Sequence, residues 1–308
     1  MLHRRPLLAA LAASAITPVA ARAQGVPSEL TYAAVPGENS TATIDRFSPF
    51  LAYLSKEIGI PVKLRLANDY AAVIEGQRAG NIHIGYHGSA GFARARMTGV
   101  AADAFVIDVN ADGTKGYNAV FYVRADSPYQ TIADLKGKNL GLVDPNSNSG
   151  YNMPMFTLNK QGIPAPDKFF ANVLMTGSHE NAIIALVHGT VDVATNWWNT
   201  DDDSSLSRML NKGMLRDAKG APMRKQDFRI ILTSDLLINP PTAYLTSLPE
   251  DLKAKIRGAF LTAHLKDKAA FDRLSDGKAQ PWQAVDNAAF DETIALIRFV
   301  DALRKRAG

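Results

Sequence analysis

The chain has 308 residues, a formal net charge of +4 and no cysteine. This length is enough for two lobes with large cores, and the lack of cysteine excludes disulfides, so stability must come from packing. Three of the 34 basic residues and none of the 30 acidic ones lie in residues 1–23. The remainder of the chain is therefore nearly neutral, with 31 basic and 30 acidic residues. This balance gives no reason to expect nucleic acid or an anionic membrane as a partner.

The N-terminus has the pattern of a secretory signal peptide. A basic start at His3-Arg4-Arg5 precedes an Ala-rich apolar stretch, residues 6–19, that is too short to span a bilayer. Ala21-Arg22-Ala23 then offers small residues at both positions before a cut, so we expect cleavage after Ala23 and an exported protein. The Arg4-Arg5 pair leaves a twin-arginine signal open as an alternative. No cysteine stands at the cut, which excludes a lipid anchor on such a residue.

Short apolar runs alternate with stretches of helical periodicity along the chain. The runs that predict strands are residues 30–35, 61–66, 82–86, 118–123, 139–143, 173–175, 191–195 and 228–233. The stretches that predict helices are residues 47–58, 70–78, 90–97, 131–135, 151–160, 181–188, 249–265 and 288–303. Strands that alternate with helices indicate parallel α/β sheets covered on both faces.

Two segments have the features of crossings between lobes. Residues 123–128 leave a strand through a turn that ends in proline, and residues 231–236 leave another strand before Asn239-Pro240-Pro241. We therefore predict one lobe from residues 24–123 and 236–308, and a second lobe from residues 124–235. Because ligands in open α/β sheets bind beyond the carboxyl ends of strands, we expect a shared cleft between the lobes.

The segment Asp144–Tyr151 carries the strongest chemical signal. It follows the apolar run 139–143 and precedes a stretch that can be helical. Ser147, Asn148 and Ser149 would place hydroxyls and an amide beside the free backbone N–H groups of a helix start. Such a start attracts an oxyanion, here without any lysine or arginine in the segment. An ordinary capped helix start is the alternative interpretation.

Other polar and aromatic residues also follow or open predicted strands. These are Tyr70, Tyr117, His179, Trp197 and Trp198. Taken singly, each has an ordinary structural explanation, as a packed aromatic residue or a helix cap. Their shared position at strand ends favours a common binding site. The acidic run Asp201-Asp202-Asp203 could supply charge to the site, but we interpret it as a solvated helix start.

An enzyme would need further signals. Ser147 or Ser149 with His179 could form a Ser–His pair, but no Gly-x-Ser-x-Gly elbow accompanies them. The chain contains no P-loop or dinucleotide fingerprint. His83 and His87 are four residues apart, but the alternating apolar pattern there predicts a strand, and His179-Glu180 lacks a second histidine four residues on. We therefore expect no metal and no cofactor.

Five ordered motifs together resemble a known family. They are Asn68-Asp69-Tyr70-Ala71, the run 111–117 (ADGTKGY), the run 144–150 (DPNSNSG), Gly177-Ser178-His179-Glu180-Asn181 and the run 191–196 (VDVATN). With them the chain resembles the phosphonate-binding proteins of bacterial ABC importers, a group that includes phosphite and phosphate binders. The resemblance implies a two-lobed, type II-like periplasmic-binding-protein fold with two hinge strands. It also implies a periplasmic location and an inner-membrane ABC permease as partner, and we expect a monomer.

The resemblance also implies roles for individual residues. The phosphonate group would be held by Tyr70, Tyr117, Ser147, Asn148, Ser149 and His179. Asn148 stands where the family commonly has threonine, and Ser178 is inserted between Gly177 and His179. The acids that some members use for an ammonium group are not matched, because the chain has Trp197-Trp198-Asn199 and Asn239-Pro240-Pro241 at those places. Trp197 or Trp198 would then contact the ligand's organic tail.

We therefore predict a solute receptor, not an enzyme, that binds a phosphonate or a related phosphorus oxyanion and closes around it. 2-Aminoethylphosphonate is one candidate ligand. A periplasmic phosphoesterase and a ligand sensor for a membrane receptor are the alternatives.

Overall fold

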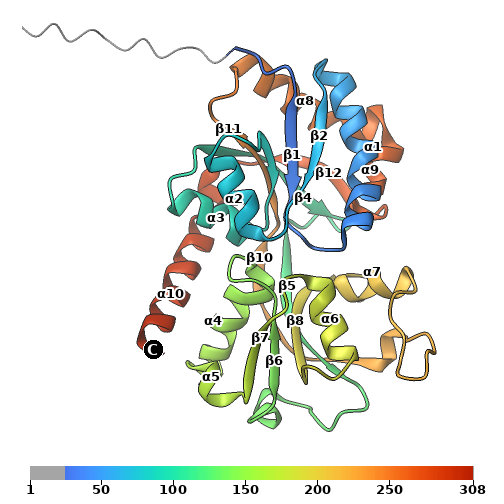
Figure 1. The fold of residues 1–308 in the computed structure, drawn as a ribbon, viewed down its shortest axis with the longest axis vertical. Coiled ribbons are helices and arrows are strands. Elements are labelled where there is room, and N and C mark those ends of the chain that lie inside the picture. Colours follow the sequence, from blue (N-terminus) through green and yellow to red (C-terminus); the bar gives the residue numbers. More distant parts are fainter. Residues whose placement is uncertain (1–24, 308) are drawn as a thin grey trace, which may run out of the picture.

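Two separate sheets organise the computed structural model, which describes residues 25–307, into two α/β lobes (Figure 1). The strand order is β12-β4-β11-β3-β1-β2 in the first lobe and β10-β5-β8-β6-β7 in the second, where β9 pairs with β8. In each sheet a parallel half is completed by antiparallel strands, so the sheets are mixed and not wholly parallel as predicted. The predicted two-lobed α/β fold is confirmed, while the predicted signal peptide lies outside the described residues.

The elements follow one another in a simple order. The first lobe contains β1 (Leu30–Ala34), α1 (Ser40–Ile58), β2 (Val62–Leu66), α2 (Tyr70–Arg78), β3 (Ile84–Tyr86), α3 (Ser89–Met97), β4 (Ala102–Asn110), β11 (Pro241–Leu245), α8 (Glu250–Lys266), α9 (Lys268–Ser275), β12 (Ala279–Ala284) and α10 (Asp291–Ala307). The second contains β5 (Gly116–Arg124), β6 (Asn139–Leu142), a π-helical turn (Asn148–Asn152), α4 (Met153–Lys160), α5 (Pro166–Phe169), β7 (Asn172–Met175), α6 (His179–Val187), β8 (Val193–Thr200), β9 (Asp203–Ser204), α7 (Ser205–Asn211) and β10 (Phe228–Ile238). None of the described helices has the length and apolarity needed to cross a membrane.

The first lobe is held together by an aromatic core. Phe50 on α1 packs edge-to-face on Phe260 of α8 with ring centroids 4.8 Å apart, and Trp282 of β12 lies 5.2 Å from the same ring. Phe105 on β4 stacks on Tyr244 of β11 at 4.4 Å. Each ring removes a large apolar area from water, so this packing holds β4 and β12 firmly in the first sheet. The two strands lie at the side of the sheet that carries polar residues toward the other lobe.

The chain crosses between the lobes at positions different from those predicted. Strand β5 pairs along its whole length with β10 in the second sheet, so the first crossing is the turn between Asn110 and Gly116, not a segment after Val123. The second crossing, at residues 239–240, joins β10 to β11. Tyr117 therefore belongs to the second lobe. The Pro128 turn that suggested the earlier boundary lies within the second lobe.

Helix α10 touches both lobes, although it follows β12 of the first. Ile297 packs with Ala90 and Ala93 of α3, and Arg94 of α3 forms an ion pair with Asp301 at 2.5 Å. On the second lobe, Val300 joins the core cluster that contains Phe121 and Leu158. The C-terminal helix thus extends from the first lobe to the second (Figure 1).

Candidate functional site

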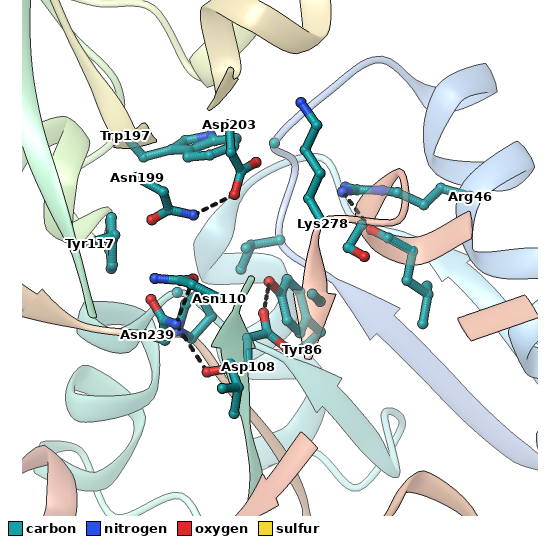
Figure 2. A pocket seen from close by; sticks show the side chains of 18 of the residues that line it. Arg46, Tyr86, Asp108, Asn110, Tyr117, Trp197, Asn199, Asp203, Asn239 and Lys278 are labelled. Carbon is teal, nitrogen blue, oxygen red and sulfur yellow. Dashed lines mark hydrogen bonds between the residues drawn. The ribbon is translucent and has the colours of Figure 1, made fainter. Parts of the chain in front are cut away.

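A cavity of about 190 Å³ lies between the two lobes (Figure 2). It is lined by residues of both sheets and of the loops that follow their strands. Seven of the eight residues predicted for the site line it: Tyr70, Tyr117, Ser147, Asn148, Ser149, His179 and Trp197. The strand ends of the two lobes therefore meet at one cavity, as the α/β topology leads one to expect.

The segment after β6 forms a tight π-helical turn. Ser147 stands at its N-cap, with extended backbone, and the Oγ atom accepts a hydrogen bond from Gly150 N at 3.0 Å. Ser147, Asn148 and Ser149 are each only 2% exposed. The turn packs closely on the end of the preceding strand, because Val143 leaves room for no side chain at Gly150. Buried hydroxyls and free N–H groups are thereby held at the cavity wall.

The side chain of Asn148 forms a hydrogen bond between the two lobes. Its Nδ2 atom donates to Ser89 Oγ, the first residue of α3 in the other lobe, at 2.8 Å. Its Oδ1 atom is buried without a hydrogen-bond partner. Ser89 was not among the predicted site residues; it is fully buried and begins a helix that has no side-chain cap.

Tyr70 and Tyr117 approach this turn from opposite lobes. Tyr70 is the first residue of α2, which Asp69 caps by accepting from Ala72 N at 2.7 Å. Burial raises the pKa of the Tyr70 phenol well above its usual value, and the hydroxyl of Ser147 beside it opposes part of that shift. Burial also raises the pKa of Tyr117, with Ser89 and Ser149 nearby. Both phenols therefore stay protonated and can donate.

His179 is the first residue of α6, at the same wall of the cavity. The inserted Ser178 is the N-cap of this helix, and its Oγ accepts from Asn181 N at 3.1 Å. Burial lowers the pKa of His179 to about 4, so the imidazole is neutral at neutral pH. Its Nδ1 atom is buried without a partner. We call Tyr70, Tyr117, Ser147, Asn148, Ser149 and His179 the hydroxyl cluster, since it offers neutral donors and no cation.

A partly buried acid from the first lobe faces the same cavity. Asp108, near the end of β4, accepts hydrogen bonds from Tyr86 Oη at 2.7 Å and from Trp282 Nε1 at 2.8 Å (Figure 2). Burial raises the pKa of its carboxyl group. No lysine or arginine of the described chain forms an ion pair with it. The side chains that donate hydrogen bonds to Asp108 are thus both neutral, while Arg208 and Arg46 act on it only as nearby charges, and the sequence analysis missed this acid.

A second acid comes from the other lobe. Asp203 is 9% exposed and lines the cavity, so the prediction of a solvated helix start is wrong for this residue. Asn199 Nδ2 donates to its Oδ2 atom at 2.8 Å, and Arg208 Nη2 lies 3.5 Å from its Oδ1 atom. We call Asp108, Asn110, Asn199 and Asp203 the acidic end of the cavity.

The two tryptophans of β8 point to opposite sides, as alternation along a strand requires. Trp197 lines the cavity, with the Arg208 guanidinium 4.8 Å from its ring centroid. Trp198 packs against the core cluster of the second lobe, and its Nε1 atom donates to Asp201 Oδ1 at 3.2 Å. Trp198, which was included in the predicted site, is therefore placed outside the cavity wall.

This placement predicts unequal effects of two matched substitutions. Trp197→Phe should change the affinity ratio between methylphosphonate and 2-aminoethylphosphonate, because it alters the room beside the acidic end. Trp198→Phe should instead lower the free energy of unfolding by roughly 1–3 kcal/mol, through lost packing and a lost hydrogen bond. Calorimetry and thermal denaturation of both variants would measure this. An unchanged ligand ranking in Trp197→Phe would contradict it.

Comparison with known proteins agrees with this architecture. A family model described as "ABC transporter, phosphonate, periplasmic substrate-binding protein" matches residues 32–290. The chain is 30% identical over 261 residues to the phosphonates-binding periplasmic protein of Escherichia coli, an alignment that covers 82% of this chain and 72% of that protein. It is 29% identical over 232 residues to the phosphate-import protein PhnD of Mycolicibacterium smegmatis, covering 72% and 70%.

A solved structure is similar over nearly the whole chain. It is a binding-protein component of an ABC phosphonate transporter from Pseudomonas aeruginosa, with a TM-score of 0.77 and 25% identity over 91% of this chain and 88% of that one. Two lobes joined by two crossings around a cavity are the architecture of a periplasmic solute-binding protein. The chain belongs to the phosphonate family of periplasmic substrate-binding proteins of ABC transporters, which confirms the resemblance.

Proposed function

We propose that this receptor captures a phosphonate whose organic tail carries an ammonium group, with 2-aminoethylphosphonate as the simplest example. The phosphonate group would bind the hydroxyl cluster, where neutral donors and the starts of α2 and α6 favour an oxyanion. The relatives named for phosphonates and for phosphate import support a phosphorus oxyanion as ligand.

Asp108 is the observation that carries the choice of tail. Asp108 is partly buried and has no ion pair within the part of the chain that the structure describes, and the nearby charges of Arg208 and Arg46 offset only part of the desolvation cost that raises its pKa. An ammonium group in the cavity would offset that cost. Asp203 would contribute from the second lobe. These two acids would bind the ammonium group, a role for which the sequence analysis found no residue that matches the family.

Contacts between the lobes support closure around the ligand. Asn39, the N-cap of α1, donates its backbone N–H to Glu180 Oε2 of α6 at 2.8 Å. Lys212 Nζ lies 3.0 Å from Glu38 Oε2. These pairs join the first lobe to the second beside the cavity. In a receptor of this kind, the closed form would then be presented to an inner-membrane ABC permease.

Export and oligomeric state complete the proposal. A signal peptide cleaved after Ala23 would deliver the chain to the periplasm, the compartment of its family. We propose that it works as a monomer and without a cofactor. A phosphoesterase would need a serine activated by a base, whereas no hydrogen bond of the described residues joins Ser147 or Ser149 to His179.

The function is tested by calorimetry with methylphosphonate, 2-aminoethylphosphonate, phosphite and phosphate. We expect 2-aminoethylphosphonate to bind most tightly of the four. Asp108→Asn should reduce the advantage of 2-aminoethylphosphonate over methylphosphonate at least tenfold, since a hydrogen bond to a charged group is worth about 1.5–3 kcal/mol. The matched control is Asp112→Asn, an exposed acid in the turn after β4, which should keep the wild-type ratio.

Two results would overturn this proposal in different ways. If the wild-type protein binds none of the four anions, the chain is not a receptor for phosphorus oxyanions. If Asp108→Asn keeps the wild-type ratio, Asp108 does not contact the tail and the ammonium assignment is wrong.

A further inference from the structure

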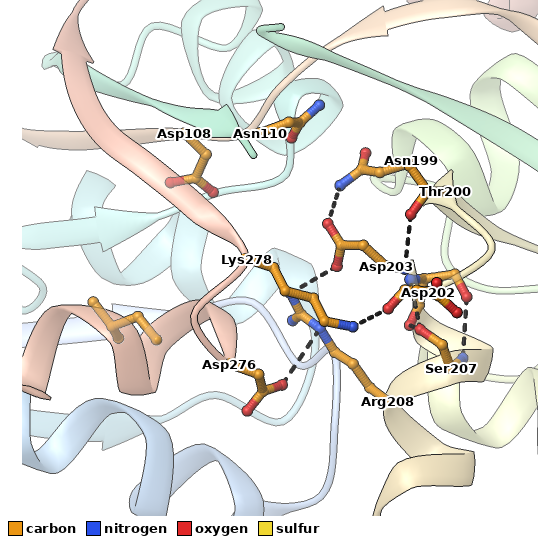
Figure 3. A network of polar contacts seen from close by, with 12 residues as sticks. Asp108, Asn110, Asn199, Thr200, Asp202, Asp203, Ser207, Arg208, Asp276 and Lys278 are labelled. Carbon is orange, nitrogen blue, oxygen red and sulfur yellow. Dashed lines mark hydrogen bonds and ion pairs between the residues drawn. The ribbon is translucent and has the colours of Figure 1, made fainter. Parts of the chain in front are cut away.

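Two cations from opposite lobes stand beside the acidic end of the cavity (Figure 3). Arg208 belongs to α7 of the second lobe, and Lys278 precedes β12 of the first. Both line the cavity, and we call them the mouth cations. An ammonium tail alone gives them no role, because like charges repel.

Arg208 is poorly paired for a guanidinium group that has five N–H donors. Its Nη2 atom lies 3.5 Å from Asp203 Oδ1, and its Nε atom lies 3.8 Å from Asp276 Oδ2 in the first lobe. Both distances are long compared with the roughly 2.7–2.9 Å of a charge-assisted hydrogen bond. The Nε atom is buried and has no hydrogen-bond partner. The planar face rests on Trp197, which leaves the edge of the fork available.

Lys278 also lacks an acidic partner. Its Nζ atom donates to the backbone oxygen of Asp202 across the cleft, and none of the ion pairs in the described chain includes it. Arg46, the third cation at the cavity, differs because it is paired with Glu38 at 2.7 Å. Unmatched positive charge is therefore concentrated at the mouth cations.

We infer that the preferred ligand carries a carboxylate beside its ammonium group, so that it is an amino acid with a phosphonate side chain. This inference rests on the proposed function and narrows its ligand class. Asp108 and Asp203 bind the ammonium group, while the mouth cations bind the carboxylate. A carboxylate matches the fork of Arg208 in a bidentate manner, and it supplies the close partner that Asp203 and Asp276 do not.

Closure is part of the same arrangement. The mouth cations come from different lobes, so one carboxylate that touches both draws the lobes together at this rim of the cavity. A penalty also contributes to specificity, because a tail without a carboxylate leaves Arg208 with only its long contacts to Asp203 and Asp276, and Lys278 with only a backbone oxygen.

Three probes that differ by single groups test the inference. The first is 2-amino-3-phosphonopropionate, which has both groups. The second is 2-aminoethylphosphonate, which lacks only the carboxylate, and the third is 3-phosphonopropionate, which lacks only the ammonium group. Calorimetry on the wild-type protein should show that the first binds at least tenfold more tightly than either of the others.

Substitutions at Arg208 test whether this residue causes the preference for a carboxylate. Arg208→Gln should lower the affinity ratio of 2-amino-3-phosphonopropionate to 2-aminoethylphosphonate to about one, and Arg208→Lys should retain part of it. Lys225→Gln is the matched control, because Lys225 pairs with Asp201 on the same lobe away from the cavity lining, and it should keep the wild-type ratio. Thermal denaturation establishes that each variant is folded, and the wild-type ranking stands as a test even if Arg208→Gln does not fold.

The alternative role of Arg208 is a latch to Asp276. In that case Arg208→Gln and Asp276→Asn would weaken all three probes by the same factor, and the inference would be overturned. Equal wild-type affinity for 2-aminoethylphosphonate and 2-amino-3-phosphonopropionate would overturn it as well. Methylphosphonate separates this outcome from failure of the proposed function: if the wild-type protein binds methylphosphonate, only the carboxylate assignment is wrong.

Discussion

Replacing Ser147 and Ser149 together by alanine should weaken phosphonate binding at least tenfold. Both hydroxyls are buried at the start of the π-helical turn, where a bound oxyanion would accept from them. Each charge-assisted hydrogen bond contributes about 1.5–3 kcal/mol, so the loss of two exceeds one factor of ten. Calorimetry with methylphosphonate is the suitable measurement, because this ligand has no tail that could compensate.

Loss of stability must be separated from loss of contact in this experiment. Ser147 also caps the turn, and removal of an N-cap costs about 1 kcal/mol of stability. Asp267→Ala is the matched control, since Asp267 caps α9 by accepting from Ala270 N at 3.0 Å and does not line the cavity. It should lower the melting temperature to a similar extent while keeping the affinity. A folded double serine variant with wild-type affinity would show that the turn does not bind the anion.

The convergence of the hydroxyl cluster could be predicted from the sequence because it follows from topology. Ser147 and His179 stand just beyond neighbouring parallel strands of the second sheet, and Tyr70 stands just beyond a strand of the first. The carboxyl ends of parallel strands meet at one edge of each sheet, and the two edges face each other across the cavity. The apolar runs that identify those strands are short and clearly bounded. The residue that departs from the family pattern, Ser178, supplies the cap of α6 and leaves His179 as its first residue.

The acidic end could not be predicted in the same way. Asp108 lies on β4, a strand that the sequence analysis did not identify, and its burial depends on Tyr86 and Trp282, which are distant in sequence. Asp203 belongs to a run of three acids, which favours a solvated loop. Only the pairing of β9 with β8 buries it. Asp108 thus owes its position to contacts with residues distant in sequence, and Asp203 owes its position to a short hairpin that its acidic run does not indicate.

The predicted crossings were wrong for a related reason. A proline turn after Val123 is a strong local signal, but Asp112-Gly113, where Gly113 has φ of 85°, forms the turn that joins β4 to β5. Turn residues such as proline and glycine indicate where the chain bends, but they do not indicate to which sheet the next strand belongs. The antiparallel pairing of β5 with β10 decides that, and it brings Tyr117 into the second lobe.

Gly150 is the position where a single methyl group should have the largest effect on both stability and binding. A Cβ atom there would lie 2.4 Å from Val143 Cβ and 2.8 Å from Ser147 Oγ. Val143 ends a buried run and cannot move away, so the turn itself must shift. Overpacking of this kind costs about 1–3 kcal/mol, and the shift displaces the hydroxyl and the N–H groups that face the cavity.

Gly150→Ala should therefore lower the melting temperature by several degrees and weaken methylphosphonate binding at least tenfold. Gly258→Ala is the matched control: Gly258 lies within α8, and the space that an added methyl group would take there is open, so alanine should raise stability by about 0.5–1 kcal/mol and leave affinity unchanged. Thermal denaturation and calorimetry on the pair distinguish the two outcomes. If Gly150→Ala is as stable as the wild-type protein and binds equally well, the π-helical turn tolerates displacement and the rigid geometry inferred for the hydroxyl cluster is wrong.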